Sequence, residues 1–294
     1  MITVTPQNYH DPATKREYMS HSQYRNWLTC PAATRAEIFD GYEPRKTDAL
    51  IVGGYVDRAL TAPEELLAYI EQYKDDIYGK KGGKLAAFVK ADMLIDRLEK
   101  DLAWQVIIKA SRKQVVMQGV IGGIPWLYMS DAQMEAHGTE TIIDLKTACD
   151  FEDDWTRIYC GPPVEPMNWM NWSNPKHFRN VKVGWIDAAG YWRQLGVGRE
   201  LFKQTREKRE PVCAIIGAKK PVTDERPVGL GLWVMDDNAR LDAEIRQIEV
   251  MLPMVMQFKS GELPAPGCGL CDYCLSKSSL EVERVAVSER EYTV

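Results

Sequence analysis

The sequence has no long apolar run and only seven cysteines among its 294 residues. No stretch approaches the roughly 20 apolar residues that a membrane-spanning helix requires, and the N-terminus lacks the basic and then apolar pattern of a secretory signal. An odd count of seven cysteines in so long a chain does not suit a disulfide scaffold. We therefore expect a soluble cytoplasmic protein with reduced thiols and no membrane partner.

A net basic charge is absent as well, because the formal net charge at pH 7 is −5. This excludes a protein coated in basic residues, but local patches rather than net charge decide nucleic-acid binding. DNA therefore stays open as a partner. With 45% hydrophobic residues, the chain can bury a large core in one big or two modest domains.

Hydrophobic periodicity divides the chain into a helical region over residues 1–103, a core over 104–260 that begins with strands, and a C-terminal segment over 261–294. The expected helices cover residues 23–39 with a break at Cys30-Pro31, then 53–60, 84–101, 185–206 and 237–259. The expected strands cover residues 105–108, 114–121, 126–131, 139–144, 212–216 and 229–235. Residues 150–183, rich in Asp, Trp, Asn and Pro, are expected to form a long loop or lid. The pattern favours an α/β fold with a helical N-terminal layer.

Two acids and a lysine stand near the ends of neighbouring expected strands. Residues two apart in a strand point to the same face, so Asp144 and Lys146 share a side while Leu145 faces the other. An antiparallel neighbour can bring Asp131 beside them. Two carboxylates and a lysine suit phosphodiester cleavage, because the acids can hold Mg²⁺ or Mn²⁺ and the lysine can orient the attacking water. The same pattern also occurs as ordinary surface decoration of a strand, so both interpretations stay open at this point.

Three neighbouring features favour a site. Apolar residues run directly up to Asp144, which indicates a buried strand, where a charge is costly without a metal or a partner. Asp57 lies on the expected helix after a Gly-Gly pair, where it can give a third ligand; the alternative is a solvated helix residue. Gln194 on the expected helix after the long loop can position a phosphate or the lysine; the alternative is a surface glutamine.

These residues carry a family resemblance. The order Gly54-x-x-Asp57, Asp131, Asp144-x-Lys146 and Tyr191-x-x-Gln194 resembles the PD-(D/E)xK nuclease superfamily, specifically the RecB-like and RecE-like exonucleases of phage and bacterial recombination. The resemblance covers about residues 20–274. It implies a restriction-endonuclease-like core, with a central mixed sheet flanked by helices.

The resemblance also implies roles for the residues. Asp131 and Asp144 would be metal ligands, Lys146 the catalytic lysine, and Asp57 would stand where many relatives have a metal-binding histidine. An aspartate there makes the site richer in oxygen, which favours Mg²⁺ or Mn²⁺. The carbonyl of Leu145 would add a ligand, and Gln194 would help to place the phosphate. Relatives often carry a tyrosine four residues after their glutamine, whereas this chain has glycine at position 198.

The cysteines give a separate signal. Cys268, Cys271 and Cys274 form a C-x2-C-x2-C sequence, a spacing that lets three thiolates face one centre. Cys30 is the best fourth ligand because it begins the Cys-Pro element. This arrangement resembles iron-sulfur nucleases of the AddB type and CRISPR-associated four-cysteine nucleases, which implies a [4Fe-4S] cluster that joins the chain ends. Their final cysteine spacing is usually longer, so Zn²⁺ and buried free thiols are alternatives.

We therefore expect a metal-dependent DNA nuclease, most simply an exonuclease that produces DNA ends for recombination or repair, in a bacterium or a phage-infected cell. Possible DNA contacts are Lys80, Lys81, Lys84 and Tyr191. A single-strand annealing or recombination protein is a possible partner, and oligomers are possible. Two other classes stay open: a catalytically inactive DNA-binding or scaffold protein of the same fold, and an iron-sulfur redox sensor.

Overall fold

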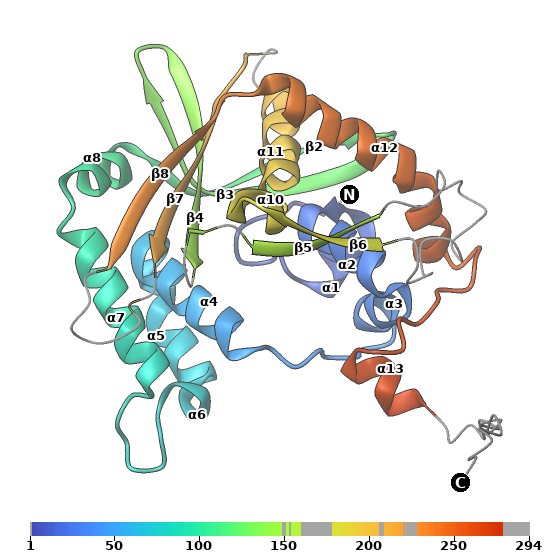
Figure 1. Cartoon of the computed structure of the whole chain (residues 1–294), viewed down its shortest axis with the longest axis horizontal. Helices are drawn as coiled ribbons and strands as arrows, with labels where there is room; N and C mark the ends of the chain where they lie inside the picture. The colour runs from blue at the N-terminus through green and yellow to red at the C-terminus, as the bar shows by residue number, and fades with distance from the viewer. Residues whose placement is uncertain are drawn as a thin grey trace, which may run out of the picture.

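The computed structural model of the chain describes residues 2–148, 151–152, 154–159, 178–205, 209–219, 221 and 228–278. Within these residues, six strands form one mixed sheet at the centre of the molecule (Figure 1). The strands are β1 (Met19–Ser20), β2 (Arg112–Ile121), β3 (Ile124–Ala136), β4 (Thr139–Ala148), β7 (Val212–Lys219) and β8 (Gly229–Met235). Their order is β1-β3-β4-β7-β8, and β2 pairs with β3. The pairs β1–β3 and β4–β7 are parallel and the other pairs are antiparallel, so the expected mixed sheet is confirmed.

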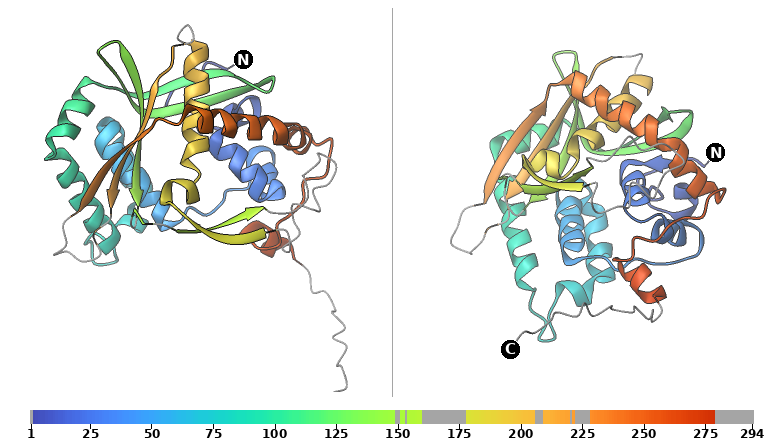
Figure 2. Two further views of the ribbon diagram at one scale, coloured as in Figure 1. Left: turned by 45° about the horizontal axis from the view of Figure 1, so that its top comes forward. Right: turned by 45° about the vertical axis from the view of Figure 1, so that its right-hand side comes forward.

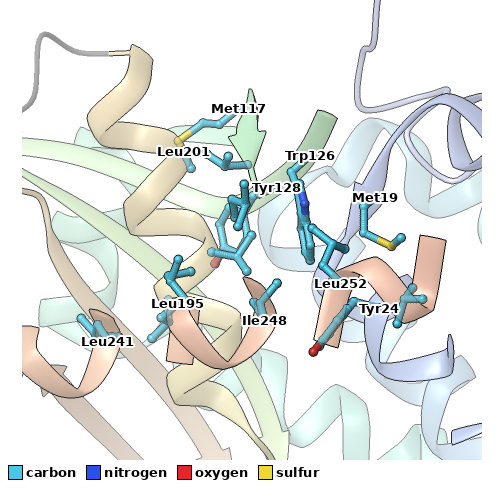
Figure 3. Close-up of a cluster of buried hydrophobic side chains, with 14 of the residues drawn as sticks. Met19, Tyr24, Met117, Trp126, Tyr128, Leu195, Leu201, Leu241, Ile248 and Leu252 are labelled. Atoms are coloured by element: carbon cyan, nitrogen blue, oxygen red, sulfur yellow. The ribbon is translucent and has the colours of Figure 1, made fainter. Parts of the chain in front are cut away.

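Helices cover both faces of this sheet (Figure 1). They are α1 (Pro12–Glu17), α2 (His21–Thr29), α3 (Pro31–Phe39), α4 (Asp48–Thr61), α5 (Pro63–Gln72), α6 (Lys74–Ile77), α7 (Ala86–Glu99), α8 (Leu102–Ala110), α10 (Trp185–Ala188), α11 (Tyr191–Thr205), α12 (Asn238–Ser260) and α13 (Asp272–Lys277). One hydrophobic core joins the sheet to α2, α11 and α12, where Trp126, Leu195 and Leu252 lie together (Figure 3). A second core joins the sheet to α4, α7 and α8.

The alternation of side chains along β4 separates these two cores. Ile142 packs in the first core and Ile143 in the second, as the two-residue period of a strand requires. On β7, Cys213 and Ala214 divide in the same way. Asp144 therefore lies on the α11 side of β4, together with Ile142.

Local sequence explains the N-terminal helices. The Ser20 hydroxyl caps α2 by accepting a hydrogen bond from the Gln23 backbone N–H at 3.3 Å. Helix α2 ends at Cys30, whose extended backbone (φ −152°, ψ 91°) is what a residue before proline prefers. Pro31 then begins α3. The predicted break at Cys30-Pro31 is present.

Three local predictions differ from the structure. Residues 105–108, expected as a strand, belong to α8, because the Asp101 carboxylate caps that helix by accepting bonds from the N–H groups of Ala103 and Trp104. The segment 150–183, expected as a loop, contains β5 (Asp154–Tyr159) and β6 (Phe178–Val183), which pair as antiparallel strands. Residues 160–177 of that segment lie outside the described residues. The helix expected over residues 185–206 is divided into α10 and α11 at Gly190, whose φ of +73° ends the first of them.

The N-terminal helices and the C-terminal segment lie side by side. Helix α3 contacts both α12 and α13, and two views show the last turns of α12 beside the N-terminal helices (Figure 2). The Arg35 guanidinium donates to the carbonyls of Phe258 and Lys259, each at 3.2 Å. The fold therefore brings Cys30 to the three C-terminal cysteines. Of the helices in the described ranges, none is long and apolar enough to cross a membrane.

Candidate active site

The candidate site lies where the pairing of strand β3 in the central sheet is interrupted. One edge of β3 pairs with β1 at Trp126 and Leu127 and with β4 from Ala132 onward. Asp131 lies on this edge between the residues that pair with β1 and those that pair with β4. Its Oδ2 accepts a hydrogen bond from the Leu145 backbone N–H at 2.6 Å. The Asp131 side chain thus takes the place of a ladder bond where β4 leaves β3.

The opposite edge of β3 is interrupted at the same level. The β2–β3 register passes from Lys113 opposite Ala132 to Val115 opposite Ser130, without a bridge at Gln114. Gln114 has a left-handed backbone, with φ of +50°, which is rare outside glycine and costs on the order of 1 kcal/mol. This distortion of the ladder is the local reason why β2 and β3 can turn polar side chains toward the site.

Asp144 and Lys146 are neighbours on one side of β4, as their spacing predicts. Lys146 Nζ lies 2.5 Å from Asp144 Oδ2, and the Asp144 side chain is only 3% exposed. Gln194 of α11 donates from Nε2 to Asp144 Oδ1 at 2.9 Å. The structure therefore brings together the acid, the lysine and the glutamine that the sequence singles out.

Lys146 is a permanent cation at neutral pH. Burial alone would lower the pKa of Lys146, but the carboxylates of Asp144 and Asp131 outweigh burial and raise that pKa above its ordinary value. Lys146 Nζ also lies 5.1 Å from the centre of the Tyr191 ring, a cation–π contact. The lysine is 21% exposed, so its ammonium group is held in place yet reachable from outside.

Asp57 joins the site from α4. Its Oδ1 accepts from the Thr61 hydroxyl at 2.9 Å, and Gln114 Nε2 lies 3.4 Å from both Asp57 carboxylate oxygens. Burial raises the pKa of Asp57, and the charge of Asp144 adds to the rise. Burial also raises the pKa of Asp131 well above its usual range, and the carboxylates of Asp144 and Asp57 add to that effect. The charge of Asp144 therefore contributes to the raised pKa of both Asp57 and Asp131, which indicates an electronegative centre.

The donors present fit a hard divalent cation. Carboxylate oxygens are the ligands that Mg²⁺ and Mn²⁺ prefer. Among the described residues, Asp144 Oδ2 is a buried oxygen with no donor in hydrogen-bonding geometry, although Lys146 contacts it as an ion pair. In an extended strand the N–H and C=O of one residue point the same way, so the Leu145 carbonyl faces β3 together with the N–H that binds Asp131.

The four predicted cysteines form a second cluster. Cys30 Sγ lies 3.6 Å from Cys274 Sγ and 3.7 Å from Cys271 Sγ, and Cys268 Sγ lies 4.0 Å from Cys274 Sγ. Within the described part of the chain, these four residues are the group of potential ligand atoms that all lie within 4.8 Å of one another. The other cysteine that the structure describes, Cys213, is buried in the first core.

The predicted DNA contacts have different surroundings. Lys80 and Lys81 are exposed in the turn between α6 and α7. Lys84 is instead held by Asp92 at 2.6 Å and by the Tyr55 hydroxyl at 2.9 Å. Tyr191 lies beside Lys146 at the start of α11. DNA contact by these residues stays a prediction.

Sequence reasoning missed the partners of Asp57. Thr61 lies four residues after Asp57 on the same helix, so helical spacing contains that signal. Gln114 is 57 positions away, and its approach depends on the distorted β2 ladder. His21 begins α2, and burial together with the charges of Arg193, Arg25 and Lys146 lowers its pKa to about 3.

The glycine at position 198 has a structural reason. A Cβ at Gly198 would lie 2.9 Å from atoms of the Tyr128 ring, so the ring occupies the space in which a side chain would begin. Burial raises the pKa of Tyr128 well above its usual value, and the charges of Asp144 and Asp131 contribute. Tyr128 of β3 thus fills the space next to position 198 of α11.

Comparison with known proteins agrees with this geometry. Residues 20–159 match a family described as a PDDEXK-like domain of unknown function (DUF3799). This part of the chain is similar to PDDEXK-like domains. A crystal structure described as a putative exonuclease from Eubacterium rectale is 24% identical, with a TM-score of 0.78 and 97% of each chain covered. At this identity the likeness shows the fold, and the expected nuclease-type fold is confirmed.

Other comparisons add little. The crystal structure of SSO0001 is 11% identical, covers 86% of this chain and 92% of its own, and has a TM-score of 0.29, which is too low to carry an argument. No curated protein matches the sequence. The likeness to PDDEXK-like domains therefore rests on the family match over residues 20–159, and the Eubacterium rectale structure supports the fold.

Proposed function

We propose that the protein is a Mg²⁺- or Mn²⁺-dependent DNA nuclease, and specifically an exonuclease that processes DNA ends for recombination or repair. The observation that carries the proposal is the meeting of Asp131, Asp144 and Lys146 at the interruption of the sheet. The likeness of residues 20–159 to PDDEXK-like domains supports a nuclease, and the description of the Eubacterium rectale protein as an exonuclease supports the exonuclease class.

In this proposal Asp57, Asp131 and Asp144 would hold the cation, and the Leu145 carbonyl would add a ligand. The bound ion would supply an activated water and would neutralise charge that develops on the phosphate. Lys146 would hold the attacking water by donating from Nζ, because its raised pKa keeps it charged. Gln194, fixed on Asp144 through Nε2, would keep that carboxylate in one orientation while the phosphate is placed.

The remaining parts of the proposal concern the setting. The place of action is the cytoplasm of a bacterium or of a phage-infected cell, and the substrate is DNA. A single-strand annealing partner and an oligomer stay predictions. The nuclease is preferred to the redox sensor because the acids and Lys146 would have no role in electron transfer.

The test is digestion of DNA labelled at its 5′ or 3′ ends, with linear and covalently closed circular forms in parallel. Each form is incubated with the full chain in Mg²⁺, in Mn²⁺ and in Ca²⁺. The proposal predicts loss of linear DNA in Mg²⁺ or Mn²⁺ with release of short labelled products, while circular DNA persists. Cleavage of the circular form would make the protein an endonuclease, and binding without cleavage in any cation would support an inactive DNA-binding protein.

A further inference from the structure

The sulfur positions of the four-cysteine cluster distinguish between the metals it could hold. The closest Sγ pairs are 3.6, 3.7 and 4.0 Å apart, and all four sulfurs lie within 4.8 Å of one another. Four thiolates at a Zn–S distance of about 2.3 Å form a tetrahedron with edges of about 3.8 Å. Thiolates on a [4Fe-4S] cluster must stand roughly 6 Å apart, because a cube of iron and sulfide lies between them. The observed spacing fits a single ion and is too small for the cluster.

The backbone around Cys268 fits the same small site. The N–H groups of Leu270 and Cys271 donate to Cys268 Sγ at 3.5 and 3.4 Å, so a tight turn wraps this sulfur. Gly269, inside the turn, has φ of +73°, a conformation that favours glycine. Backbone N–H donors stabilise a thiolate, which is the form that binds a metal.

Close packing limits the room inside the cluster. A Cβ at Gly267 would lie 2.9 Å from Cys274 Sγ, so the chain passes directly against this sulfur. The Ala32 N–H donates to the Pro266 carbonyl at 3.1 Å, which fixes the segment before Cys268 to the start of α3. The backbone thus packs closely around the sulfurs in their present positions.

We infer that Cys30, Cys268, Cys271 and Cys274 bind one zinc ion tetrahedrally, and that the [4Fe-4S] cluster implied by the family resemblance does not fit this chain. The C-x2-C-x2-C sequence places three of these sulfurs in one short turn and the helix that follows it. With four protein ligands the site has no open position, so its role is structural. The inference does not depend on the proposed nuclease activity.

The site joins distant parts of the chain. Cys30 and Cys274 are 244 positions apart, and Cys30 lies between α2 and α3 while Cys274 lies in α13. A bound zinc ion would fasten the helical N-terminal layer to the C-terminal segment. Because zinc has no redox chemistry, oxygen would not decompose the site as it decomposes exposed iron-sulfur clusters.

The test begins with the full chain, produced in medium that contains both zinc and iron and purified without oxygen. Elemental analysis should give about one zinc per chain, without acid-labile sulfide and without a visible absorption band. Cys271→Ser should lose most of the zinc, whereas Cys213→Ala, which changes a buried cysteine outside the cluster, should keep it. Four irons with sulfide, one iron, or no bound metal would each overturn the inference.

A second measurement does not depend on whether a variant folds. X-ray absorption at the zinc edge of the wild-type protein should show four sulfur neighbours at about 2.3 Å. Nitrogen or oxygen neighbours in place of two or more sulfurs would place the zinc elsewhere and would contradict the inference. Since neither readout uses DNA cleavage, an inactive protein with one tetrahedral zinc would refute the proposed function and leave this inference standing.

Discussion

Individual residues in the site depend on partners far away in the sequence. Asp57 has the Thr61 hydroxyl on its own helix and Gln114 from β2, and Gln114 adopts a left-handed backbone to reach it. A residue in such a conformation persists only where the surroundings hold it. We interpret Gln114 as a positioning residue that fixes the Asp57 carboxylate.

Gln114→Ala is therefore expected to weaken Mn²⁺ binding about tenfold, the lower end of the effect of removing a group that orients a metal ligand. The measurement is a titration of Mn²⁺ into the wild type and the variant. Gln118→Ala is the matched control, because Gln118 lies on the same strand and is exposed. Equal affinities in all three proteins would contradict a role for Gln114 in holding Asp57.

The raised pKa of Asp131 predicts how stability depends on pH without added Mg²⁺ or Mn²⁺. For a carboxyl whose pKa is raised by folding, the stabilisation is present below the ordinary pKa of about 4 and is lost as pH rises through the raised pKa. Asp131→Asn cannot ionise, so the wild type should lose free energy of unfolding relative to the variant as pH rises from about 4 toward neutrality.

Urea unfolding at a series of pH values measures this difference. Asp96→Asn serves as control, because Asp96 is 61% exposed and pairs with Lys100 on the surface of α7. The control should follow the wild type in parallel over the whole range. If Asp131→Asn also runs parallel to the wild type, the Asp131 carboxyl is not held in a buried, electronegative place.

At the scale of elements, a sequence pattern predicts the structure where that pattern is compatible with only one type of element. The alternating residues of β4 predict that Asp144 and Lys146 share a side, and their contact follows. The apolar residues 105–108 have two interpretations, since a short apolar run suits a strand or a helix. Asp101 was the deciding signal, because a helix cap favours α8. The approach of Gln114 to Asp57 has no such local signal.

The four-cysteine cluster connects α3 with α13, because Cys30 directly precedes α3 and Cys274 lies in α13. Removing its metal should lower the free energy of unfolding by on the order of 3 kcal/mol, because metal binding contributes directly to folding. Hydrogen exchange with and without a zinc chelator measures which elements lose stability when the metal is removed. We expect faster exchange in α13 and at the start of α3 and little change in β7, whose residues are buried in the sheet.

Uniformly faster exchange over the whole chain would contradict this account, since it would mean that the cluster is required by the sheet itself. Unchanged exchange in α13 would mean that the cluster does not fasten the C-terminal segment. The sheet has its own two hydrophobic cores, so its protection should survive the loss of metal.

At the scale of the whole molecule, the candidate site combines residues from the helices on both faces of the sheet with residues at the interruption of β3 pairing. Asp57 comes from α4 in one layer, Gln194 comes from α11 in the other, and β3 and β4 supply the remaining groups between them. The α/β class and the mixed sheet could be predicted from the sequence, because strands and helices have distinct periods. The interruption of the ladder could not be predicted from the sequence, because it depends on where β1 and β4 each stop pairing with β3.

The central claim is that Lys146 and the acids form one catalytic centre, and single-turnover cleavage of linear DNA tests it most directly. In Mg²⁺ or Mn²⁺, Lys146→Ala should cleave at least about 100-fold more slowly than the wild type, with DNA affinity changed by no more than about threefold. Lys109→Ala, which removes an exposed lysine of α8, should cleave at the wild-type rate. Equal rates for the wild type and Lys146→Ala, or an absence of cleavage by the wild type, would contradict the claim.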